Sequence, residues 1–147
     1  MRTLYEASGG HDRLREMTEA FYAKAVADDV LGAMFTAAAS EHARWLAGWM
    51  TVSFGGPRDY VEERGDLRFV IWQHAGLKFT EDQRARWAEL MLTSAREVGM
   101  PAAFMPGFTQ YVEVITRSVA EQSHMSLPEM RVMLGYPEGF TPTPASG

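Results

Sequence analysis

The sequence contains no cysteine among its 147 residues. This absence excludes disulfides, thiolate zinc or iron–sulfur sites, a thiol nucleophile and haem attached through C-x-x-C-H. Any metal must therefore be held by His, carboxylate, Tyr or Met side chains. Basic residues are also few, 14 against 19 acidic ones, and the resulting net charge of -5 argues against binding nucleic acid over a broad surface.

Long apolar runs are lacking too. No stretch approaches the roughly 18 residues of a membrane span, and the opening MRTLYEASGGHDR has no signal-peptide pattern. We therefore expect a cytoplasmic protein with no membrane partner. A hydrophobic content of 46% with 8 Phe, 5 Tyr and 4 Trp is enough for a buried core, and the length suits a single domain.

Apolar residues recur at helical spacing between breaks made by glycine and proline. The periodicity predicts four main helices, over about 14–25, 40–53, 80–98 and 107–123. The third has a T-x-x-Q capping box, in which Thr80 is the N-cap. No stretch of four or more residues alternates apolar and polar between turn signals, so the predicted class is all-α.

Two segments show weaker patterns. Between the second and third helices, residues 57–79 predict only a short helix around 67–74. Near the C-terminus, 126–134 predicts one more short helix, and the last ten residues are expected to be mobile. The resulting division is a domain over 1–125 and a partly disordered extension over 126–147.

The four histidines are the first candidates for chemistry. His11 follows a Gly-Gly turn and His124 ends a helix, so both are expected at the solvated surface. His42 is in register with apolar residues of its helix, where a boundary role is the simpler interpretation. His74 lies among apolar residues, as either a core histidine or a ligand. No H-E-x-x-H, G-x-S-x-G, P-loop or G-x-G-x-x-G motif occurs.

One histidine in an apolar setting, a second histidine on another helix and several aromatic helix faces are a set that haem would use well. Haem needs a neutral imidazole for its iron, apolar walls for its faces and cations for its propionates. The open iron face could bind a gas, with Tyr or Trp donors nearby.

Motifs in a fixed order point to a family. They are LYEASGG at the start, an F-Y pair and D-x-V-L between residues 15 and 31, F-G-G-P at 54–57, a Tyr at 60, E-R-G at 63–65, H-A-x-x-K-F-T at 74–80 and R-x-x-W-x-x-L-M at 84–91. Over about residues 3–123 the chain resembles the group II truncated haemoglobins, short bacterial globins. The resemblance implies a globin-like two-over-two helical sandwich around one haem b.

The resemblance also implies roles for individual residues. His74 takes the position of the proximal iron ligand. Tyr22, which follows Phe21, takes the position of the Tyr that points at the distal ligand. Trp87 matches the distal Trp of this group, and His42 falls at the distal-histidine position. For Tyr22 and Trp87 plain core packing is the alternative. Further positions that line the haem or its rim are matched by Phe35, Leu46, Tyr60, Leu77, Lys78 and Phe79.

The chain departs from the family pattern near the proximal ligand. Gln73 stands where the family has a basic residue, and the preceding stretch carries one extra residue and lacks the usual His-Pro. Nearby candidates for the propionate anchors are Lys78, Arg64 and Arg68. The extension beyond His124 has no counterpart in the family.

The function implied by the resemblance is reversible binding of oxygen, and also of carbon monoxide and nitric oxide, at ferrous haem iron. Release is expected to be slow, which suits nitric oxide or peroxide detoxification better than bulk transport. An enzymatic side activity as nitric oxide dioxygenase or peroxidase stays open and would need a reductase partner. The chain is expected to be a monomer or homodimer. The alternatives are a haem-free interaction module with Met-rich faces, or a gas sensor acting through a partner.

Overall fold

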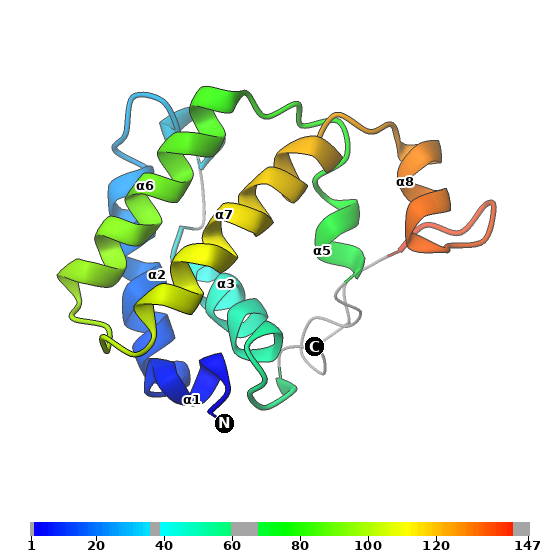
Figure 1. Cartoon of the computed structure of the whole chain (residues 1–147). Coiled ribbons are helices and arrows are strands. Elements are labelled where there is room, and N and C mark those ends of the chain that lie inside the picture. The colour runs from blue at the N-terminus through cyan, green and yellow to red at the C-terminus, as the bar shows by residue number, and fades with distance from the viewer. Residues whose placement is uncertain (1, 36–38, 60–67, 143–147) are drawn as a thin grey trace.

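The computed structural model describes residues 2–35, 39–59 and 68–142, and for 39 and 40 the backbone alone. The described residues form helices and no strands, so the predicted all-α class is confirmed. None of the described helices is long and apolar enough to span a bilayer. Figure 1 shows the order of the elements along the chain. Their bounds are α1 Leu4–Ser8, α2 His11–Ala25, the 3₁₀ turn η1 Gly32–Met34, α3 Ala39–Ser53, α5 Arg68–Trp72, α6 Glu81–Glu97, α7 Met105–Gln122 and α8 Leu127–Leu134.

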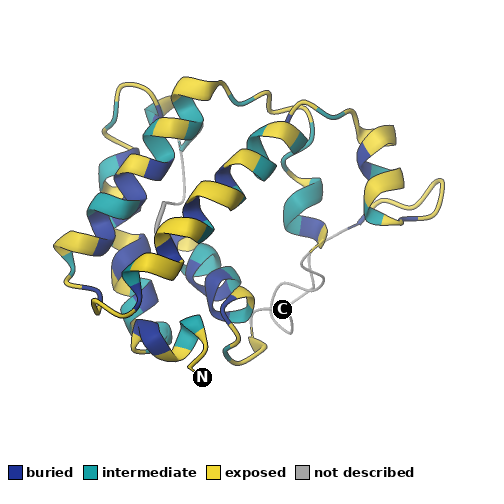
Figure 2. Cartoon of the chain, viewed as in Figure 1, coloured by how far each residue is buried: buried dark blue, intermediate teal, exposed yellow. Residues whose placement is uncertain are grey.

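Two pairs of long helices form the body of the molecule. α2 packs against α3, α6 packs against α7, and contact between α2 and α6 joins the pairs. α6 and α7 run in opposite directions, as the colour gradient in Figure 1 shows. The residues that these helices turn toward one another are buried, and their outer faces are exposed (Figure 2). The largest fully buried side chains include Leu14, Met17, Phe21, Leu31, Met50, Met91, Phe104, Phe108 and Val112.

Capping residues set several helix ends, and the cap of α6 was predicted from the sequence. Thr80 caps α6 in the expected capping box: its hydroxyl accepts from the Gln83 N–H at 3.1 Å, and its own N–H donates to the Gln83 side chain at 2.9 Å. Ser126 and Glu129 form a second capping box on α8. The short helix expected around 67–74 is α5, and Val98, placed in the third helix from sequence, is the C-cap that follows α6.

The glycine break after α3 has a steric cause. Gly55 has a φ of +94°, which favours glycine. Gly56 lies against the ring of Tyr5, where a Cβ would come within 2.6 Å of a ring carbon. The close approach lets α1 pack beside the end of α3, and the Tyr5 N–H donates to the Phe54 carbonyl at 3.0 Å. The sequence pattern did not predict α1 as a helix.

Candidate functional site

A cavity of about 760 Å³ lies between the helix pairs and the segment around α5. Its volume falls in the range of small-molecule and cofactor sites. All four long helices contribute lining residues, as does the segment that carries His74. The apolar and aromatic part of the lining is Tyr22, Ala33, Met34, Phe35, Trp45, Leu46, Trp49, Met50, Val70, Ile71, Leu77, Phe79, Trp87, Tyr111, Ile115, Val119 and Ala120.

Most of the residues predicted from sequence meet in this cavity. They are Tyr22, Phe35, His42, Leu46, His74, Leu77, Lys78, Phe79 and Trp87. Arg68 is not among the lining residues and instead donates to the Leu134 carbonyl at 2.9 Å. Tyr60 and Arg64 lie outside the described residues. Gln73, which stands where the family has a basic residue, also borders the cavity.

His74 follows α5 by two residues and borders the cavity, and its ring centroid lies 6.1 Å from that of Phe79. Burial lowers the pKa of His74 below its usual value, and a contact with the backbone of Val70 partly opposes that shift. The contact between His74 and Val70 falls short of hydrogen-bond geometry. The buried Nδ1 of His74 therefore has no hydrogen-bond partner within the described part of the chain. The imidazole is therefore neutral near pH 7, the form that ligates a metal.

Tyr22 reaches the cavity from α2 within a cluster of rings. Its ring packs edge-on against Phe35 with centroids 5.2 Å apart, and it lies 5.9 Å from the His42 ring. The residue is only 9% exposed, and burial raises the pKa of its phenol above the usual range. The hydroxyl thus stays protonated, and it makes no hydrogen bond to another described residue. It is a donor available to whatever fills the cavity.

Trp87 and His42 bring further donors from two other helices. Trp87, on α6, packs against Phe21 with ring centroids 4.9 Å apart. His42, on α3, contacts the rings of Tyr22 and Trp45. Over the described ranges, neither side chain has a hydrogen-bond partner, and both border the cavity. The wall formed by α2, α3 and α6 therefore combines aromatic surface with N–H and O–H groups that the protein leaves available.

Tyr111, a second tyrosine of the lining, differs from Tyr22 because its hydroxyl already takes part in a hydrogen bond within the protein. The Trp49 indole N–H donates to the Tyr111 hydroxyl at 3.0 Å, linking α3 to α7. Burial raises the pKa of Tyr111 to about 12, while hydrogen bonds with Trp49 and Ser53 oppose the rise. Sequence reasoning put both rings on helix faces without predicting that they pair across the cavity.

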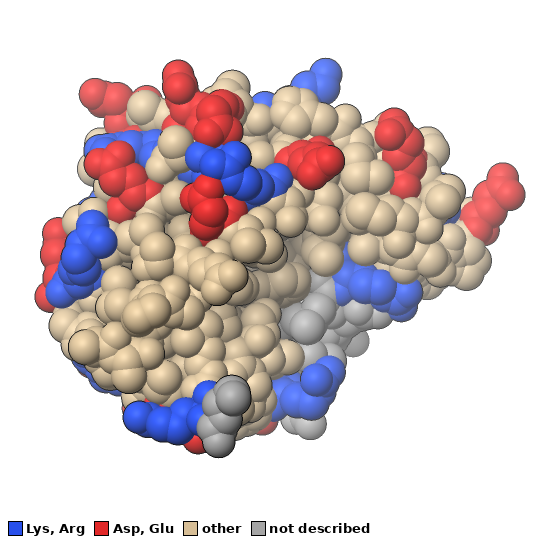
Figure 3. All heavy atoms as spheres, viewed as in Figure 1, with Lys and Arg blue, Asp and Glu red and all other residues tan. Residues whose placement is uncertain are grey.

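Arg84 is a lining residue that sequence reasoning did not assign to the site. It comes from the first turn of α6, where its guanidinium pairs with Glu81 at 2.7 Å and donates to Thr116 at 3.2 Å. The signal was present in the R-x-x-W spacing, which puts Arg84 one turn before Trp87 on the same face. Arg84 has a second acidic partner in Glu113, with 3.8 Å between nitrogen and oxygen. On the face shown in Figure 3, charged side chains lie mainly toward the edges and uncharged ones fill most of the middle.

The remaining two histidines lie outside the cavity lining. His11 was expected at the solvated surface but is half-buried, because its Nδ1 lies 2.8 Å from the Thr51 hydroxyl across α2 and α3. His124 is exposed, as expected, with Nε2 2.9 Å from the Phe79 carbonyl.

Comparison with known proteins gives consistent results. The sequence model of the bacterial-like globins matches residues 3–120. A haemoglobin from Chloroflexus aurantiacus is 30% identical, with a TM-score of 0.72 over 81% of this chain and 98% of that one. A truncated haemoglobin from Bacillus subtilis, described as oxygen-avid, is 25% identical, with a TM-score of 0.71 over 80% and 98%. A group II truncated haemoglobin from Bacillus anthracis, 21% identical over 81% and 91%, shares the fold with a TM-score of 0.74.

Proposed function

The chain belongs to the bacterial-like globin family, and from this premise we propose that it holds haem b through His74 and reversibly binds oxygen. Membership makes it a haem-binding globin; the haem type, the gas and the roles of single residues are the proposal. One observation carries it. A single cavity of about 760 Å³ is bordered both by a neutral imidazole and by donors that the protein does not use itself.

The lining suits a flat, largely apolar ring with two acidic substituents. Aromatic and aliphatic side chains dominate the walls, which matches the faces of a porphyrin. The neutral His74 imidazole would hold the iron, and its buried Nδ1 could donate a hydrogen bond to the Val70 carbonyl once ring and backbone adjust. Lys78 is the cationic side chain of the lining on the His74 side, and we assign it to a propionate.

Bound haem would supply a ferrous iron that takes up a diatomic gas. The residues of the opposite wall would then decide how firmly the gas is kept. Tyr22 and Trp87 each present a donor on a large apolar body, so they can hold a polarised ligand while excluding water. His42 stands next to Tyr22 and is proposed as a third donor.

Firm retention of oxygen is supported by this donor set and by the oxygen-avid relative. Slow release favours redox chemistry on the gas over bulk transport. Turnover of nitric oxide or peroxide beside the same hydrogen-bond donors would need electrons from a separate reductase. The described residues offer no observation that favours a haem-free interaction module over this function.

The experiment that tests the function is an oxygen titration of the purified, haem-loaded chain followed in the visible spectrum. We expect stoichiometric haem uptake, distinct ferric, ferrous and oxygenated spectra, and recovery of the ferrous spectrum when oxygen is removed. Oxidation to the ferric form on each exposure to oxygen, without a reversible oxygenated species, would contradict reversible binding.

A further inference from the structure

The segment after α7 packs on the helix that leads to His74. The C-terminal segment, defined here as residues 126–142, comprises α8 and the chain that follows it. Among the described helices, α8 is the one that α5 contacts most. It lies beyond residue 120, where the match to the family model ends. Figure 1 shows α8 beside α5, at a distance from the two helix pairs.

The contacts between them are aromatic and cationic. The Tyr136 ring meets Trp72 of α5 edge-on, with centroids 5.9 Å apart. The Arg68 guanidinium lies 4.6 Å from the centre of the Tyr136 ring, and that of Arg131 lies 5.5 Å from the centre of the Trp72 ring. Each such pair is stabilising where it is shielded from water.

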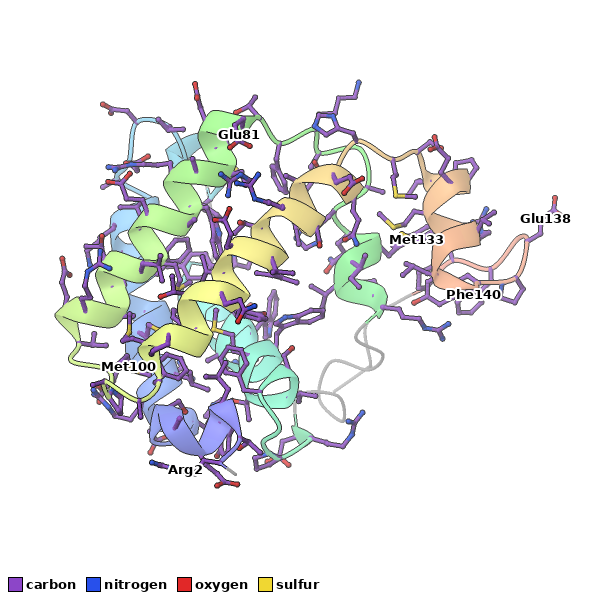
Figure 4. All side chains as sticks on the ribbon, viewed as in Figure 1. Arg2, Glu81, Met100, Met133, Glu138 and Phe140 are labelled. Carbon is purple, nitrogen blue, oxygen red and sulfur yellow. The ribbon has the colours of Figure 1, made fainter. Side chains whose placement is uncertain are left out.

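Hydrogen bonds to backbone carbonyls add to these contacts, one between α5 and α8 and one within the C-terminal segment. Arg68 donates to the Leu134 carbonyl at 2.9 Å, and Arg131 donates to the Phe140 carbonyl at 3.1 Å. In Figure 4, Phe140 lies below α8, whereas Glu138 projects away from the molecule at the outer end of the segment. The chain after α8 is thereby folded back onto α8 beside Tyr136, whose ring lies 5.3 Å from that of Phe140.

Some buried side chains of this region lie outside the main core. Phe69, Met130 and Tyr136 are buried, yet none of them belongs to the main core, which within the described ranges has Val112 as its last buried member. A helix of five residues is too short to be stable alone. The position of α5 therefore depends on tertiary contacts, and among the described helices α8 supplies more of them than any other.

The other end of the His74 segment is tied to the end of α7. Ser123 accepts the Lys78 N–H on its carbonyl and the Phe79 N–H on its hydroxyl, both at 2.9 Å. His74 thus lies between two attachment points, one on α8 and one on α7.

We propose that the C-terminal segment is a positioning element that holds α5 against α8 and so fixes where His74 presents its imidazole. The proposal rests on the proposed function in one respect, because the imidazole is taken to be the haem ligand. The placement of α5 can be tested without haem.

The test compares three variants of the full chain. Tyr136→Ala removes the ring that contacts both Trp72 and Arg68. Tyr136→Phe keeps the ring and is the conservative variant. Val132→Ala is the control, because Val132 is on the same helix but 82% exposed.

Amide hydrogen exchange in residues 68–79 of the haem-free chain is the first readout. We expect Tyr136→Ala to speed this exchange about 10- to 100-fold, from the lost ring pair and cation–π contact. Exchange in α6 and α7 should change less than about 2-fold, because the main core contains none of the altered contacts. Tyr136→Phe and Val132→Ala should exchange like the parent. Unchanged exchange in 68–79, or an equal increase throughout the core, would overturn the proposal.

The iron–histidine stretching band of the ferrous, gas-free protein is the second readout. We expect Tyr136→Ala to shift or broaden this band and to speed haem transfer to an apoglobin acceptor about 10-fold, with Tyr136→Phe restoring both. An unshifted band with parental haem transfer would contradict the link to His74. If the parent takes up no haem, the proposed function fails, while the exchange experiment still decides whether the C-terminal segment holds α5.

Discussion

Replacing Tyr22 with Phe removes one hydroxyl from the cavity wall and leaves the ring cluster intact. The edge-on contacts of the ring with Phe21 and Phe35 do not involve the hydroxyl. Because that hydroxyl bonds to no other described residue, its loss breaks no hydrogen bond in this part of the protein. Any change in gas binding then reports on contact between Tyr22 and the ligand.

The size of the effect follows from the burial of the group. At 9% exposure the phenol is shielded from water, and burial raises its pKa, so it remains a donor at all ordinary pH values. A hydrogen bond from such a donor to a polarised acceptor contributes about 1–3 kcal/mol. At 1.4 kcal/mol per factor of ten, losing it should speed oxygen release roughly 5- to 150-fold.

Stopped-flow dissociation of oxygen and of carbon monoxide provides the assay. Carbon monoxide is less polarised on binding than oxygen, so its release should change much less in Tyr22→Phe. Tyr111→Phe is the matched control, because it deletes a hydroxyl from the same cavity that is already engaged by Trp49. Oxygen release in that control should not speed up by more than about 2-fold, because the change removes no unengaged donor and leaves the Trp49 N–H without its acceptor. Equal, small changes for both gases in Tyr22→Phe would refute the reasoning and reduce Tyr22 to a packing residue.

Three further predictions concern other contacts. His42→Ala should change the rate of carbon monoxide association or the ferric spectrum, since His42 borders the cavity beside Tyr22; identical rates and spectra would mean that it contacts no ligand. Tyr111→Phe should lower the free energy of unfolding by about 1–2 kcal/mol in urea titrations, because it removes the acceptor of the Trp49 N–H; parental stability would argue against that hydrogen bond. Hydrogen bonds from Arg86, and then from the backbone of Leu31 and Val30, lower the pKa of Asp28. The stability that this carboxylate contributes is therefore present above its unfolded pKa, near 4, and is lost as pH falls through its folded pKa. Asp28→Asn should therefore lose less thermal stability than the parent between pH 5 and about 2, and parallel curves would exclude this linkage.

Much of the fold could be predicted from local signals. Thr80 and Gln83 identified the start of α6 because a capping box is a pattern within four residues. The short helix predicted over 126–134 is α8, which has the same kind of cap. α1 escaped prediction because its five residues are too few to show helical periodicity.

Contacts between distant residues account for what the sequence could not indicate. The Trp49–Tyr111 hydrogen bond joins residues 62 positions apart, and a helix face does not say which partner it meets. Arg68 was predicted as a propionate anchor because it is a cation near His74, but its guanidinium lies against Leu134 and Tyr136. Cavity-lining positions such as Tyr22, His42 and Trp87 followed from the family resemblance, and their roles toward a ligand stay predictions.

Haem retention by a His74→Ala variant tests the central claim most directly. The claim is that this imidazole, on the cavity wall and neutral through burial, is the protein ligand of the haem iron. His11→Ala is the control, since it removes an imidazole that is half-buried but outside the cavity lining. We predict that His74→Ala purifies without haem or loses it rapidly, that added imidazole restores uptake, and that His11→Ala keeps the parental spectrum. A His74→Ala protein with full haem content and unchanged ferric and ferrous spectra would contradict the assignment.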